Sequence, residues 1–225
     1  MKLKLCMIKE DAQGMRISYE FRDASNNLVV AKAADNINEY ISLWYDNKEY
    51  QLPNYPKVIV KPPINFKYPL SSKRKKTIGF HIMESGECCA KFYGEAATCR
   101  KKGIFKKNIG FTVFEFEQKA YMLFRVGFPK DKSHYYCLYD NNGTTVAIIE
   151  RHSFYEDNCK ATIYVEDSNY VTIALLACTE EIVSVANSGN RDEMMDTSAG
   201  HYISMLDEEK ELLDRSFLEH VRLSN

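Results

Sequence analysis

A run of apolar residues from Tyr170 to Cys178 constrains this chain more than any other feature. Because nearly every position in the run is apolar, a helix built from it has almost no polar face, and such a helix must be buried. Asp167 or Ser168 can cap its start, and Gly189 can end it. We therefore predict a buried helix over residues 169–187.

The length of this helix limits where it can lie. About eighteen residues at 1.5 Å per residue span roughly 27 Å, which is the height of a small β-barrel. Glu180 and Glu181 interrupt the apolar run. No stretch of the chain reaches the roughly 18 charge-free apolar residues that a membrane-spanning helix needs. We therefore expect the helix to lie in a protein core.

Most of the chain before this helix has the pattern of β-strands. Ile17, Tyr19 and Phe21 alternate with polar residues, and Asn142-Gly143 is a strong hairpin signal. Fifteen Tyr and twelve Phe favour half-buried pleated surfaces. The segments that we predict as strands are 3–9, 15–22, 28–33, a hairpin over 41–51, 58–60, 77–83, 88–93, 109–116, 120–126, 135–139, 145–149 and 160–165.

The end of the chain has a different pattern. Leu206, Leu213, Phe217 and Val221 recur at helical spacing from about residue 204 to residue 222, opposite a charged face. The apolar stripe of this amphipathic helix needs a surface to dock against. We therefore divide the chain into a β-rich domain over 1–189, which includes the buried helix, and a helical extension over 190–225.

Charge is unevenly distributed along the chain. Residues 57–107 contain thirteen Lys and Arg against three Glu, a net charge of +10, whereas residues 140–225 contain six basic against seventeen acidic residues, a net charge of −11. Two explanations fit this separation. The two regions face each other in the fold or in a dimer, or the basic region forms a face that attracts anionic partners.

Nine basic residues carry most of this positive charge. If their two segments meet at one end of the fold, they form a patch that attracts anionic lipid headgroups by about 1 kcal/mol per residue, or phosphate groups. The alternative is a pair of solvated loops with no ligand. Aromatic residues are barely interleaved with them, with Phe105 as the candidate for base stacking, which argues against single-stranded nucleic acid. The predicted anion- or lipid-binding residues are Lys73, Arg74, Lys75, Lys76, Arg100, Lys101, Lys102, Lys106 and Lys107.

The seven cysteines give no catalytic or metal-binding motif. Cys88 and Cys89 are adjacent, which is not the spacing of a zinc knuckle, and His81 is the only His near them. The chain starts without the apolar core of a secretory signal, so we expect reduced thiols and a cytoplasmic protein, with possible attachment to the membrane surface.

Catalytic arrangements also lack support. His134 or His152 could pair with Cys137 or Cys159, but no residue nearby would activate a thiol. No glycine-rich phosphate loop or nucleotide fingerprint is present. We therefore expect a protein that is not an enzyme and that has no metal or cofactor.

A resemblance to a known family enters at the end of the β-rich region. The segment 136–143 (YCLYDNNG), the strands 146–149 and 161–167, and the apolar run that follows resemble the Tubby C-terminal-like superfamily, closest to its LURP-one-related members. The resemblance covers about fifty residues. It implies a closed antiparallel barrel of about twelve strands threaded by the hydrophobic helix. In that family this helix nearly ends the chain, whereas about 36 residues follow it here.

Two functional hypotheses follow. The first is a non-enzymatic binding or scaffold module whose basic loops recognise anionic lipid or phosphate. The superfamily includes phosphoinositide-binding proteins and phospholipid scramblases, but no lipid-binding residue can be carried over to this sequence. The alternative is a protein-interaction or oligomerisation module without a small-molecule ligand, which uses the helix within 203–222.

Overall fold

The computed structural model describes residues 1–10, 17–36, 40–53, 58–60, 77–99, 107–128, 134–152, 159–184 and 207–223. Thirteen strands account for most of them. In chain order they are β1 (Lys2–Glu10), β2 (Ile17–Asp23), β3 (Val29–Asn36), β4 (Tyr40–Tyr45), β5 (Lys48–Pro53), β6 (Val58–Val60), β7 (Thr77–Glu84), β8 (Glu87–Cys99), β9 (Lys107–Phe116), β10 (Lys119–Gly127), β11 (His134–Asp140), β12 (Thr145–Arg151) and β13 (Cys159–Val165).

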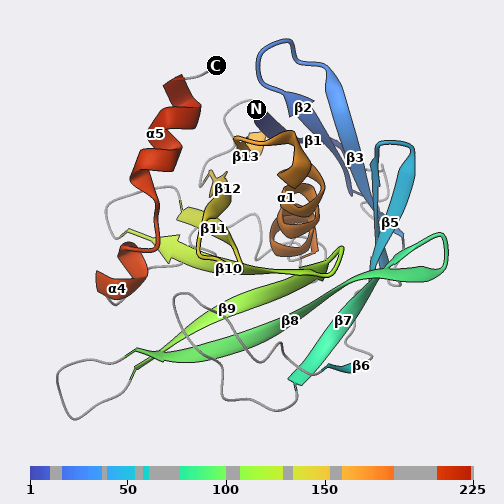
Figure 1. The fold of residues 1–225 in the computed structure, drawn as a ribbon. Coiled ribbons are helices and arrows are strands. Elements are labelled where there is room, and N and C mark those ends of the chain that lie inside the picture. The colour runs from blue at the N-terminus through green and yellow to red at the C-terminus, as the bar shows by residue number, and fades with distance from the viewer. Residues whose placement is uncertain are drawn as a thin grey trace.

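Twelve of these strands form a closed antiparallel barrel, as predicted (Figure 1). Each strand pairs with its sequence neighbours, β1 pairs with β13, and a short pairing of β5 with β7 closes the ring. β6 lies outside the ring, as an additional strand beside the start of β7. Closure leaves the ring without a free edge, which removes a surface that otherwise promotes aggregation.

The buried helix lies inside the barrel. A single 3₁₀ turn, η2 (Ser168–Tyr170), leads into α1 (Val171–Cys178), and the helical path continues as a π-helical segment, η3 (Thr179–Ser184). Asp167 caps the start, because its side chain accepts a hydrogen bond from the Asn169 amide. The predicted helix is therefore confirmed over residues 169–184 and begins one residue earlier, at Ser168. Residues 185–187 and Gly189 lie outside the described residues.

Strand alternation explains how the barrel surrounds this helix. On β10, Tyr121 and Leu123 belong to the inner core with α1, whereas Met122, Phe124 and Val126 belong to a second apolar cluster on the outer wall. β11 and β12 are buried along nearly their whole length, which is typical of strands covered on both faces. The outer wall over these strands must therefore be covered by another part of the chain.

The C-terminal residues provide this cover. Two short helices, α4 (Asp207–Lys210) and α5 (Arg215–Leu223), lie along the outside of the barrel (Figure 1). We call residues 207–223 the clasp. Its apolar side chains pack into the outer cluster formed by β8 to β13; they are Leu212, Leu213, Phe217, Leu218 and Val221. The predicted amphipathic helix thus docks on its own barrel.

The clasp corrects the prediction of one continuous helix over 204–222. The helix breaks between α4 and α5, and Asp214 starts the second helix by accepting a hydrogen bond from the Phe217 amide at 2.9 Å. Tyr139 on the barrel donates its hydroxyl hydrogen bond to the carbonyl oxygen of Leu212 at 2.6 Å. The break places both Leu212 and Leu213 against the barrel, which a continuous helix would not do.

Candidate anion-binding end of the barrel

The strand order gives the barrel two different ends. At the end that we call the turn end, tight turns follow β2, β4, β7, β9 and β11, and β13 leads into η2. The strand ends that border the longer connections lie at the opposite end, which we call the loop end. The central helix begins at the turn end, and η3 extends toward the loop end.

Several carboxylates lie at the turn end, and three of them fix the geometry of their turns. Asp140 accepts hydrogen bonds from the amides of Asn142 and Thr144, both at 2.8 Å. Asp23 and Asp167 hold their turns in the same way. Carboxylates in this arrangement fix local backbone geometry. The acidic residues of the turns are Asp23, Asp46, Glu84, Glu87, Glu117, Asp140, Glu166 and Asp167.

The two predicted basic segments both connect to the loop end. Val60 and Thr77 are register partners, so the segment 61–76 leaves and rejoins the sheet at the same place. Cys99 and Lys107 are also register partners, and they border the segment 100–106. Continuing the β7–β8 register places Thr77 beside residue 95 of β8, about 13 Å along the strand from Cys99.

Eight of the nine predicted site residues lie outside the described residues, namely Lys73, Arg74, Lys75, Lys76, Arg100, Lys101, Lys102 and Lys106. Lys107 was predicted as a loop residue, and it is instead the first residue of β9. The reason is that β8 and β9 continue to pair beyond the predicted strand ends, as far as the Cys99–Lys107 pair. The topology therefore brings the borders of both segments to one end of the barrel.

Inside the barrel, an ion pair lies near this end. The Arg125 guanidinium donates hydrogen bonds from Nε and Nη2 to Oε2 of Glu181, the first of them at 2.9 Å. The Thr112 hydroxyl donates to Oε1 of the same carboxylate at 3.1 Å. The Glu181 side chain is 1% exposed and the Arg125 side chain is 49% exposed. Solvent at this end therefore contacts the cation and not the carboxylate.

Two further side chains near the ion pair have shifted pKa values. Burial and the adjacent Glu181 raise the pKa of Glu180 well above its usual value. Burial, with a smaller contribution from Glu181, raises the pKa of Tyr136 to about 12. The Tyr136 hydroxyl lies 3.1 Å from Nε2 of His134. The raised pKa means that the Glu180 carboxyl keeps its proton to a higher pH than a solvent-exposed carboxyl does.

The Cys–His pairs considered from the sequence are not formed among the described residues. His134 faces the interior and contacts Tyr136, whereas Cys137 lies in the outer cluster under the clasp. His152 contacts the Thr162 hydroxyl at 2.9 Å, and the Cys159 thiol donates to the carbonyl oxygen of Ala161. Burial raises the pKa of both Cys137 and Cys159. The described part of the chain contains no group of three or more potential metal ligands.

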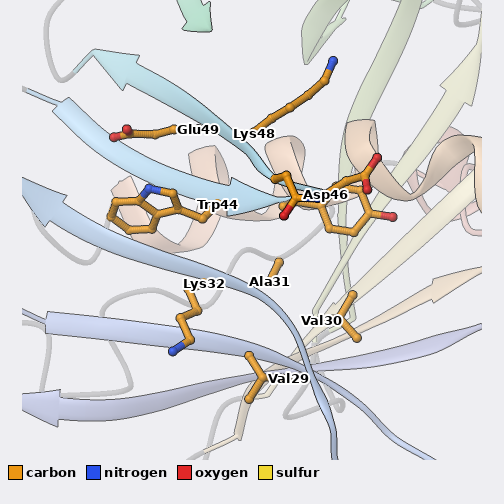
Figure 2. Close-up of a pocket in the computed structure, with 10 residues that line it drawn as sticks. Val29, Val30, Ala31, Lys32, Trp44, Asp46, Lys48 and Glu49 are labelled. Atoms are coloured by element: carbon orange, nitrogen blue, oxygen red, sulfur yellow. The ribbon is translucent and has the colours of Figure 1, made fainter. Parts of the chain in front are cut away.

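A second candidate is a shallow cavity of about 540 Å³ on the barrel wall (Figure 2). It lies where β3 diverges from the β4–β5 hairpin, and Trp44, 41% exposed, forms part of its lining. Nζ of Lys32 lies 3.7 Å from Oε1 of Glu20, and Nζ of Lys48 lies 3.2 Å from Oε1 of Glu84. Glu49 accepts a hydrogen bond from the Ser42 hydroxyl at 2.6 Å. Because both its lysines are paired with carboxylates, this cavity has no charge that would select an anion.

These features define a class: a mainly-β protein built as a closed antiparallel barrel around a central helix, with its basic segments attached to one end. No family model, curated protein or solved structure matches the chain. None of the described helices is long and apolar enough to cross a membrane.

Proposed function

We propose that this protein is a non-enzymatic binding or scaffold module that recognises phosphate-bearing anionic groups at the loop end of its barrel. The observation that carries the proposal is topological. The strand ends bordering the basic segments 61–76 and 100–106 lie at the same end of the barrel, while the acidic turns lie at the opposite end. The ten basic and no acidic residues in these two segments would create a strong positive potential there.

The Arg125–Glu181 ion pair is a second argument for placing the anion-binding site at the loop end. Its carboxylate is buried and its guanidinium is half-exposed, so the pair presents positive charge outward. Arg is well suited to phosphate, since its planar group donates several hydrogen bonds in a fixed geometry. The raised pKa of Glu180 also makes this carboxyl less prone to carry a negative charge that would repel an anion.

Membership of the Tubby-like superfamily is part of the proposal. The resemblance in sequence implies a barrel threaded by a hydrophobic helix, and the fold has this arrangement. The agreement supports a binding role on the membrane surface, where the basic segments would contact anionic headgroups. A cytoplasmic location, peripheral to the membrane, is the corresponding proposal for the cell.

The alternative of self-association through the C-terminal helix receives less support. The apolar face of α5 already packs against the barrel wall, so it is occupied within one chain. A dimer formed through this face would first have to release the clasp.

Vesicle flotation tests the proposal. The wild-type protein should float with vesicles that contain anionic phospholipid, and float less at higher salt, because salt screens exposed charges. Reversing three charges in the first segment should abolish flotation, whereas reversing three lysines at the turn end and barrel wall should not. The test variant is Lys73→Glu, Lys75→Glu, Lys76→Glu, and the control is Lys32→Glu, Lys48→Glu, Lys119→Glu.

A competition experiment distinguishes recognition of phosphate groups in solution from recognition of the lipid surface. If the protein recognises free phosphate groups, inorganic phosphate should release it from the vesicles at constant ionic strength. If it recognises the lipid surface, sulfate and phosphate at equal ionic strength should act equally. Equal flotation of the wild type and the test variant would contradict the proposal.

A further inference from the structure

Two cysteines lie opposite each other where the first and last strands of the barrel meet. The β1–β13 register pairs Cys6 with Cys159, after an irregularity that skips Lys160. Both thiols are free, and both are partly exposed. Residues directly opposite in an antiparallel pair have Cα atoms about 4.5–5.5 Å apart. This range falls inside the roughly 4.4–6.8 Å that a disulfide bridges, so the register is compatible with a bond between them.

The two thiols also lie on the same face of the sheet. Leu3 and Leu5 of β1 point into the core, so Cys6, one position further, points outward. Lys4 is close enough to both cysteines to influence the pKa of each, and Cys6 influences the pKa of Cys159. On β13, the irregularity at Lys160 interrupts the alternation that turns Ala161 inward, and the Cys159 thiol has a hydrogen bond with the side chain of Thr162, the register partner of Lys4. The register and this contact therefore place both thiols on the outer face of the sheet.

Strand register pairs no other described cysteine with a cysteine, although Cys159 is close enough to Cys178 to influence its pKa. Cys137 and Cys178 are buried in different clusters, on opposite faces of the barrel wall. Cys88 is exposed, but its register partner is Met83. Among the described residues, Cys6 and Cys159 are the one cysteine pair that strand register brings together.

We propose that Cys6 and Cys159 form a reversible disulfide across the β1–β13 seam when the protein meets a peroxide. In the first step the Cys6 thiolate attacks one peroxide oxygen, the O–O bond breaks, and a sulfenic acid and water or an alcohol form. In the second step the Cys159 thiolate attacks the sulfenic sulfur, the S–O bond breaks, and the hydroxyl leaves as water. The two thiols together lose two electrons and two protons, and the peroxide gains them.

We assign the first step to Cys6 because two cations, Arg22 and Lys4, act to lower its pKa, whereas Lys4 is the one cation that does so at Cys159. Burial raises the pKa of Cys6, and the nearby Arg22 and Lys4 partly offset this effect. Cross-linking should therefore become faster as pH rises and more of the thiolate forms. The bond would join residues 6 and 159 and so restrict the unfolded chain, which stabilises the fold.

Peptide mapping under non-reducing conditions tests this modification. After treatment of the full chain with hydrogen peroxide, trypsin should yield residues 5–9 linked to residues 152–160, and the intact mass should fall by two hydrogens at that pair. Cys6→Ser and Cys159→Ser should each abolish the linked peptide, and Cys88→Ser should leave it unchanged. Dithiothreitol should restore the original mass, and the wild-type protein should melt at a higher temperature after oxidation.

Three results would overturn the proposal. They are the absence of the linked peptide at a dose that oxidises Cys88, oxidation of Cys6 or Cys159 to sulfonic acid without any link, and a mixture of cysteine pairings equal to that formed in denaturant. Since the modification does not involve the basic segments, flotation of the Cys6→Ser variant with anionic vesicles should match that of the wild type. The two proposals can therefore fail independently.

Discussion

Arg222 of α5 donates a hydrogen bond from Nη2 to Oε2 of Glu150 on β12 at 2.9 Å and so fastens the end of the clasp to the barrel wall. The Glu150 side chain is 11% exposed. It also accepts hydrogen bonds from the hydroxyls of Tyr164 and Tyr135. The guanidinium carbon of Arg222 lies 5.4 Å from the centre of the Tyr164 ring. The positive charge of Arg222 therefore offsets much of the free-energy cost of burying the Glu150 carboxylate.

Replacing Arg222 should therefore destabilise the protein more than loss of a surface ion pair would. Arg222→Met keeps part of the apolar stem and leaves the Glu150 carboxylate without its cation, at a cost of about 1–3 kcal/mol in the free energy of unfolding. Urea denaturation measures this change. Adding Glu150→Gln should recover part of the loss, because the amide needs no counter-charge; an equal or larger loss in the double variant would show that the ion pair is not the cause.

The apolar face of the clasp gives a second prediction. Phe217→Ala should weaken docking of α5, because it removes an aromatic ring from the outer cluster, and such losses cost about 3–5 kcal/mol when the site is well packed. Glu219→Ala changes the exposed side of the same helix and is the control. Hydrogen exchange should accelerate in α5 and in β11 and β12 for the first variant alone. Unchanged exchange in β11 and β12 would show that their protection does not depend on the clasp.

The central helix should also tolerate truncation poorly. Leu175→Ala should lower the free energy of unfolding by about 2–5 kcal/mol, because Leu175 is fully buried between α1 and the surrounding strands. Thr172→Ala on the same helix changes a partly exposed residue and should have a much smaller effect. Chemical denaturation compares the two variants, and a similar cost for both would contradict the burial pattern described for α1.

The raised pKa of Glu180 predicts how the free energy of unfolding should change with pH. Its folded-state pKa is raised above its usual value of 4.5, so the folded protein holds this proton more tightly than the unfolded chain does. The resulting stabilisation is fully present below pH 4.5 and is lost as pH rises through the folded-state pKa. Glu180→Gln removes this dependence, so its free energy of unfolding should rise relative to that of the wild type with increasing pH.

Urea denaturation at a series of pH values measures this difference. Glu219→Gln, on the exposed face of α5, is the control and should follow the wild type. If the wild type and Glu180→Gln have parallel pH profiles, the Glu180 carboxyl does not keep its proton in the folded state.

Local sequence patterns predicted the elements that have a strong local cause. The sequence patterns located every strand of the barrel, with most ends within three residues, and Asp140 to Gly143 predicted a hairpin turn that the structure contains. The largest error in length is at β8, which continues six residues beyond its predicted end to Cys99, where it pairs with the extended start of β9 at Lys107. Their added residues lack clear alternation, and pairing between the two strands extends them where local preference does not.

The candidate site was harder to predict from the sequence than the strands were. The charge clusters were visible, but no local pattern shows that the segments 61–76 and 100–106 connect to one end of the barrel. The Arg125–Glu181 pair joins residues 56 positions apart and has no motif in the sequence. Its one sequence signal is the presence of two carboxylates in an otherwise apolar helix, which calls for a compensating cation.

The sequence by itself determined that residues 170–178 must be buried, because a helix without a polar face has no stable position in water. Only the tertiary structure decided what surrounds that helix, where the clasp docks, and that Cys6 lies opposite Cys159. These three outcomes depend on strand register and on packing between distant segments. A shift of one residue in register would turn every side chain of a strand to its other face, and local preferences carry too little information to specify that choice.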